Sequence, residues 1–121
     1  MHIQFAELPV FDQERAKAFY TTNLGFGVAA DAPMGDDGWR WIELSIPGAA
    51  THLHFIGRAD DALSADPVLV FMDDDVPATV AALRDRGVEI TSEPQPSPWS
   101  PGSIAAEFRD SEGNRIVLSS K

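Results

Sequence analysis

The chain has 121 residues, of which 44% are hydrophobic and 23% are charged, a composition typical of one soluble globular domain. Nine basic residues against nineteen acidic ones give a net charge of −10, which disfavours nucleic acid as a partner because a phosphate backbone would be repelled. There is no cysteine, no N-terminal signal pattern and no run of about 18 apolar residues, so we expect a cytoplasmic protein without disulfides, zinc–thiolate sites or a membrane partner.

The first half of the chain reads as a strand, a helix and three strands. An apolar run over residues 3–10 predicts the first strand, and Asp12 is a favourable N-cap for a helix that ends near Asn23. Gly25 follows, as glycine commonly does just past a helix end. Apolar and alternating runs predict three further strands over residues 26–30, 39–46 and 51–56.

The same order restarts after a linker that we place at residues 58–66. Three aspartates at 73–75 with Pro77 are typical of a helix start rather than of a metal site, and Gly87 marks the end of that helix. The proline-rich residues 93–102 predict a long loop. The remaining apolar runs predict strands over residues 67–72, 88–91, 103–108 and 115–119.

This repeated order predicts an α+β fold with an internal duplication. We expect a single domain over residues 1–121, built from two βαβββ modules at residues 1–57 and 67–121.

Three segments carry a resemblance to a known family. They are residues 19–26, with Phe-Tyr followed by Leu-Gly-Phe, the helix end at 82–87, and residues 108–116, with Phe-Arg-Asp-Ser-Glu-Gly-Asn-Arg-Ile. In register with the repeated order, they resemble the vicinal oxygen chelate superfamily, which includes glyoxalase I, extradiol dioxygenases, fosfomycin-resistance enzymes and bleomycin-resistance proteins. The resemblance implies that the two modules curl into a U-shaped cleft, usually completed in a homodimer.

The resemblance also implies where a divalent metal would be held in the enzymes of the family. Its four ligand positions fall on Phe5, His54, Val68 (or Pro67) and Val117. Only His54 is a ligand type, whereas a useful site needs about three protein ligands. We therefore expect no metal cofactor, with His54 as the one candidate ligand.

Strand alternation predicts an open sheet face that combines aromatic side chains with a few polar groups, which suits a flat organic ligand. We expect Trp39, Trp41 and Trp99 to lie along one cavity, with Trp99 on the loop most able to cover it. The alternative is that Trp39 and Trp41 fill the core or a dimer interface. The candidate ligand-binding residues are Phe5, Glu7, Trp39, Trp41, Glu43, His52, His54, Trp99, Arg115 and Val117.

Our functional hypothesis is metal-independent binding of a small aromatic or cationic molecule by a homodimer, without turnover, as in bleomycin-resistance proteins. Tryptophan stacks on planar rings and attracts cations at its face. A glyoxalase- or dioxygenase-like enzyme that uses His54 with Glu7 or Glu43 to hold a metal is an alternative. Two others are a metal-free enzyme with His54 or Glu43 as general base, and a module that senses a metabolite. The sequence leaves open whether the protein is an enzyme and which ligand it takes.

Overall fold

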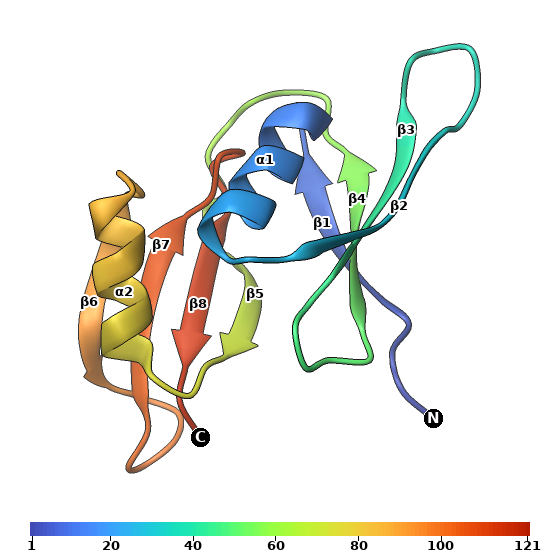
Figure 1. Ribbon diagram of the computed structural model, residues 1–121. Helices are drawn as coiled ribbons and strands as arrows, with labels where there is room; N and C mark the ends of the chain where they lie inside the picture. Colours follow the sequence, from blue (N-terminus) through green and yellow to red (C-terminus); the bar gives the residue numbers. More distant parts are fainter. The chain divides into compact units, whose positions relative to one another are not determined.

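The computed structural model describes residues 1–121, which divide into two compact units, residues 1–61 and 62–121. The elements of the first unit are β1 (Phe5–Val10), α1 (Gln13–Asn23), β2 (Gly27–Pro33), β3 (Arg40–Ser45) and β4 (His52–Gly57) (Figure 1). Those of the second unit are β5 (Pro67–Met72), α2 (Val76–Asp85), β6 (Ile90–Pro96), β7 (Ile104–Arg109) and β8 (Arg115–Ser119). The predicted α+β class and the two βαβββ modules are thus confirmed. Neither helix has the length and apolarity that crossing a membrane requires.

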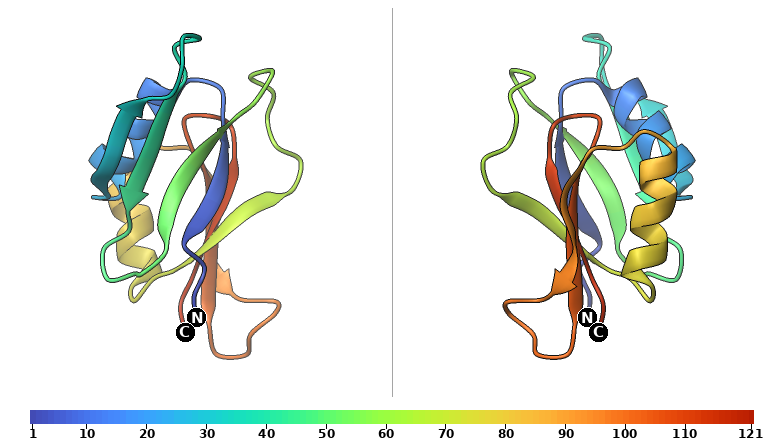
Figure 2. Two further views of the ribbon diagram at one scale, coloured as in Figure 1. Left: turned by 90° about the vertical axis from the view of Figure 1, so that its right-hand side faces the viewer. Right: turned by 90° about the vertical axis from the view of Figure 1, so that its left-hand side faces the viewer.

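Each unit contains one four-stranded sheet, and the two sheets have corresponding strand orders, β1-β4-β3-β2 and β5-β8-β7-β6. The first strand of each unit pairs in parallel with the last, and the other neighbours pair antiparallel. In the first unit, β2 and β3 form a twisted hairpin whose loop projects beyond the ends of β1 and β4 (Figure 2). In both sheets the last strand of the unit, β4 or β8, is an inner strand with a neighbour on each side.

One face of the first unit's sheet is buried along β1, β3 and β4, whereas the edge strand β2 has no buried residue. The side chains of the sheet alternate along the strands, as a half-buried sheet requires. The helix α1 begins where the Asp12 carboxylate accepts a hydrogen bond from the Arg15 backbone N–H at 3.1 Å. The Gln13 side chain then ties the helix to the backbone of Arg40 in β3. The fully buried strand residues are Leu8, Val10, Ile42, Leu44, Leu53 and Phe55.

The second unit repeats this plan, with an aspartate again at the start of its helix. Asp75 caps α2 by accepting from the Ala78 backbone N–H at 3.1 Å, which confirms the capping role predicted for the aspartates. The helix lies along β6 and β7 (Figure 1). Its apolar stripe and the sheet supply the buried residues Val76, Val80, Leu83, Ala106, Phe108, Ile116 and Leu118.

A glycine follows the end of each helix. Gly25 and Gly87 have φ angles of +70° and +82°, and no atom lies within 4 Å of a Cβ added at either position. The requirement for glycine is therefore conformational rather than one of space. This confirms the reading of the two helix exits as equivalent features of a duplicated fold.

The proline-rich segment differs from the prediction. The strand β6 extends to Pro96, so the connection to β7 is shorter than the loop predicted for residues 93–102. β6 is an edge strand of its sheet, and an edge strand tolerates proline because half of its N–H groups need no ladder partner. The prolines therefore mark the sheet edge rather than the end of the strand.

Candidate functional site

The open face of the first sheet brings together three ionisable side chains from three adjacent strands. In the strand registers, Glu7 of β1 and Glu43 of β3 both lie opposite His54 of β4. The three side chains alternate with the buried Leu8, Leu44 and Leu53, and so lie on the other face of the sheet. The fold thus places Glu7 and Glu43, which lie 47 and 11 positions before His54 in the sequence, in one row with it.

The first contact in this row joins Glu7 and His54. Nδ1 of His54 lies 2.6 Å from Oε2 of Glu7, a short charge-assisted hydrogen bond. The His54 residue is only 8% exposed, whereas about half of the Glu7 side chain is open to solvent. The carboxylate therefore orients an almost buried imidazole from the rim of the face.

Glu43 holds the second imidazole and the indole of the site. Its Oε2 lies 3.0 Å from Nδ1 of His52, and its Oε1 accepts the Nε1–H of Trp41 at 2.9 Å. These two hydrogen bonds, that from His52 first and that from Trp41 second, lower the pKa of the Glu43 carboxyl below its usual range. Glu43 is thereby kept ionised, and both of its oxygens are engaged.

Three rings pack against one another beside the carboxylates. The rings of Trp41 and His54 are 4.1 Å apart at an interplanar angle of 34°. Phe5 meets Trp41 edge-on with a centroid distance of 5.8 Å and lies 5.5 Å from His54. We call the group the first-sheet cluster, defined as Phe5, Glu7, Trp41, Glu43, His52 and His54. Six of the ten candidate residues are therefore brought together, as the alternation predicted.

Trp39 is not part of this cluster. It precedes the first residue of β3, and its indole lies 3.7 Å from a Cβ built on Gly57, on the side of the sheet where Leu53 and Phe55 are buried. It lines a hollow of about 510 Å³ with residues 11–14 and 37–40. The alternation rule fails here because the residue lies outside the strand. The structure separates Trp39 from Trp41, and its role in ligand binding stays a prediction.

The other candidates lie in the second unit. Trp99, which is 56% exposed, lines a hollow of about 170 Å³ to which Val117 also contributes. Sequence reasoning missed most of its wall, because residues 92–96 read as loop and alanines carry no functional signal. The lining residues are Ser92, Gln95, Pro98, Trp99, Ala105, Ala106, Glu107 and Val117.

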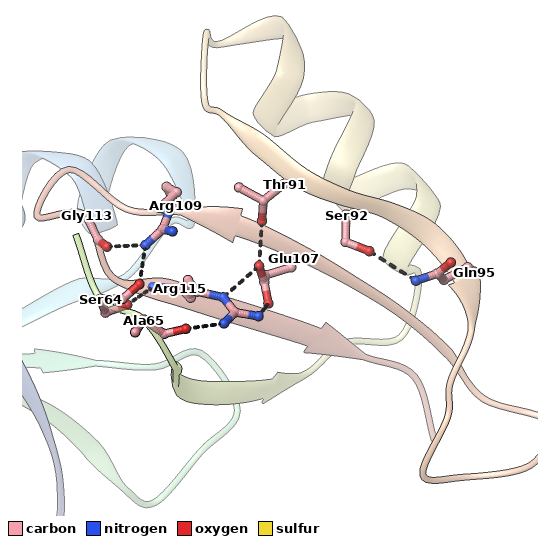
Figure 3. A network of polar contacts seen from close by, with 9 residues as sticks. All are labelled: Ser64, Ala65, Thr91, Ser92, Gln95, Glu107, Arg109, Gly113 and Arg115. Atoms are coloured by element: carbon pink, nitrogen blue, oxygen red, sulfur yellow. Dashed lines mark hydrogen bonds and ion pairs between the residues drawn. The ribbon is translucent and has the colours of Figure 1, made fainter.

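Arg115 is engaged in an ion pair rather than free for a ligand. Its guanidinium donates to both oxygens of Glu107 at 3.1 and 2.9 Å, and it also donates to the Ala65 carbonyl (Figure 3). The Thr91 hydroxyl donates to the same carboxylate at 2.7 Å. Chiefly because of Arg115, the pKa of the Glu107 carboxyl is lowered. A ligand-binding role for Arg115 stays a prediction.

The residues at the four family metal positions do not fit a divalent ion. Phe5, Val68 and Val117 have no lone pairs to donate. No group of three or more His, Cys, Asp or Glu side chains in residues 1–121 is gathered as a metal site would need.

Comparison with known proteins places this fold in context. The family model described as Glyoxalase/Bleomycin resistance protein/Dioxygenase superfamily matches residues 2–118. Uncharacterized protein YetH of Bacillus subtilis (strain 168) is 34% identical over 113 residues, which cover 90% of this chain and 89% of YetH.

Two solved structures from Streptomyces sp. CB03234 are also similar to the chain. TnmS3, described as an antibiotic binding protein, has a TM-score of 0.81 and 35% identity, with 99% of this chain and 95% of TnmS3 covered. A glyoxalase/bleomycin resistance protein has a TM-score of 0.76 and 36% identity, with 97% and 98% covered.

Proposed function

The chain belongs to the glyoxalase/bleomycin resistance protein/dioxygenase superfamily, and we propose that it binds a small aromatic, cationic organic molecule without a metal ion. The observation that carries this proposal is the first-sheet cluster, in which a tryptophan, a phenylalanine and an imidazole pack beside two carboxylates. Such a surface offers ring faces for stacking and negative charge at the rim. The proposed mechanism is sequestration, that is, affinity without turnover.

The charges of the site favour a positively charged ligand. Glu7 and Glu43 are partnered by imidazoles and an indole rather than by lysine or arginine, so their charges are not cancelled by a permanent cation. The net charge of −10 acts in the same direction during approach. A cation on a planar ring gains stacking and cation–π attraction of about 1 kcal/mol per well-placed ring.

The comparisons support a binding protein of this kind. TnmS3 is described as an antibiotic binding protein, and its 35% identity extends over 99% of this chain. This similarity supports capture of an organic molecule, while the first-sheet cluster suggests its charge and shape.

The Glu7–His54 pair also suggests a second candidate, a metal-free enzyme in which His54 acts as general base. A carboxylate behind an imidazole is the arrangement that such bases use. Proton abstraction from a carbon acid would, however, build negative charge next to Glu7 and Glu43, where like charges repel. We therefore place binding before proton abstraction.

Binding of a planar cation tests the proposal. We expect isothermal titration calorimetry to show binding of the planar cation proflavine. Trp41→Ala should lower the affinity about tenfold, since a stacking face worth about 1 kcal/mol is lost. Asp36→Ala, which removes an exposed acid elsewhere in the first unit, should change the affinity less than twofold. Tighter binding of an anionic ring such as naphthalene sulfonate, or equal effects of the two substitutions, would contradict the proposal.

We further propose that the protein is a homodimer. Val70 and Met72 on the edge strand β5 are 54% and 59% exposed, an apolar pair that a soluble monomer would leave in contact with water. Light scattering at micromolar concentration should give twice the mass of the chain. Val70→Lys should shift the mass toward the monomer, and a monomeric mass for the unsubstituted protein would refute the proposal.

A further inference from the structure

The hydrogen-bonding groups of the first-sheet cluster are divided unequally between donors and acceptors. Its N–H donors are already used inside the protein, because the Trp41 indole donates to Glu43 and the Nδ1 atoms of His52 and His54 face carboxylate oxygens. The remaining groups, Oε1 of Glu7 and Nε2 of each imidazole, can only accept when the rings are neutral. A ligand therefore meets acceptors without matching donors.

The Glu7 carboxylate fixes which nitrogen of His54 carries the proton. An ionised carboxylate only accepts hydrogen bonds, so the short contact of 2.6 Å requires a proton on Nδ1. In the neutral ring the lone pair then lies on Nε2. The protein provides no hydrogen-bond partner for this atom, and it is not among the buried unpaired atoms, so solvent or a ligand reaches it.

The surroundings of His54 make it costly to leave the lone pair on Nε2 without a hydrogen-bond donor. The residue is only 8% exposed, and Trp41 and Phe5 pack against its ring, so a stacked ligand would displace water from Nε2. A buried acceptor that loses water without gaining a donor costs free energy. The site should therefore favour ligands that replace the displaced water with an N–H group.

We propose that this site selects planar ligands whose cation carries an N–H donor, that is, protonated amines rather than quaternary ammonium ions. The proposal rests on the binding function above and deepens it. Nε2 of His54 accepts the hydrogen bond, and Glu7 acts as a positioning residue that holds the tautomer. The carboxylates supply attraction for either kind of cation, while His54 distinguishes between them.

A pair of ligands that differ by one methyl group tests the selection. Anthracen-9-ylmethyl-dimethylammonium keeps one N–H, whereas the trimethyl analogue has the same ring and charge but no donor. By calorimetry we expect the dimethyl compound to bind about tenfold more tightly, as loss of a hydrogen bond between a cation and its acceptor implies. The primary amine should bind like the dimethyl compound, which separates loss of the donor from gradual steric effects.

Substitutions at His54 assign the effect. His54→Phe keeps a ring against Trp41 but should bind the dimethyl and trimethyl compounds equally, and His54→Gln should restore the preference because its amide oxygen accepts. Glu7→Ala, at a half-exposed position, should reduce the preference severalfold because the tautomer is released. Circular dichroism of each variant checks that it is folded.

The outcomes separate this inference from the binding function. Equal binding of the dimethyl and trimethyl compounds by the unsubstituted protein, or an undiminished preference in His54→Phe, overturns the selection and leaves cation binding standing. An undiminished preference in Glu7→Ala overturns the positioning role of Glu7. Absence of binding by every member of the series overturns the binding function, and this inference with it.

Discussion

The two sheets carry a glutamate at the same place and use it differently. Glu43 of β3 lies opposite His54, and Glu107 of β7 lies opposite Val117 in the corresponding register. Glu43 is bound by an imidazole and an indole, whereas Glu107 is held by two nitrogens of Arg115. The second glutamate thus has its charge cancelled by a permanent cation, and the first does not.

Elsewhere on the open face, too, the first sheet carries polar or aromatic side chains where the second carries small or aliphatic ones. By register, Trp41, His54 and Glu7 of the first sheet correspond to Ala105, Val117 and Val70 of the second. The buried positions between them have stayed equivalent, since Leu53 and Ile116 are both completely buried. The comparison indicates that a shared framework supports two different faces, with the proposed ligand-binding groups concentrated on the first.

Truncation of the framework should have the largest effect and the same effect in both units. Leu53→Ala and Ile116→Ala each remove a completely buried aliphatic side chain, so each should lower the free energy of unfolding by about 2–5 kcal/mol. Urea unfolding followed by circular dichroism measures both. A loss below 1 kcal/mol at only one position would show that the two cores are not equivalent.

Much of this framework could be predicted from the sequence because it depends on local signals. The capping aspartates, the glycines after each helix and the period-two runs each have one physical meaning at their positions. The extension of β6 through Pro94 and Pro96 could not be predicted, because proline is tolerated there only at a sheet edge. Strand order is a property of the whole sheet and is not encoded in a local run.

The candidate site was partly predictable for a related reason. Alternation alone places Trp41 on the same face as Glu43, and His54 on the same face as His52. It does not give the pairing of strands, so the contact between Glu7 and His54 depends on the parallel register of β1 and β4. Trp39 lies outside the strand, where alternation no longer determines the direction of a side chain.

Removal of one carboxylate charge from each sheet should affect ligand affinity differently. Glu43→Gln should weaken binding of proflavine by about threefold, as loss of one partly screened carboxylate implies. Glu107→Gln should leave the affinity unchanged, because Arg115 already cancels that charge. Calorimetry at low salt measures both. Equal losses would mean that the ligand senses the overall charge of the protein rather than the first sheet.

Acidification should give the smallest effect. In the folded state, hydrogen bonds lower the pKa values of Glu107 and Glu43. The largest contribution comes from Arg115 for Glu107 and from His52 for Glu43. A lowered pKa stabilises the fold above the unfolded value of 4.5, and this stabilisation is lost as the pH falls through the folded value. The loss of unfolding free energy between pH 5 and pH 3 should therefore shrink in Glu107→Gln and Glu43→Gln, by a fraction of a kcal/mol each. Urea midpoints at the two pH values measure it, and an unchanged loss in both variants would show that neither hydrogen-bonded carboxylate stabilises its sheet.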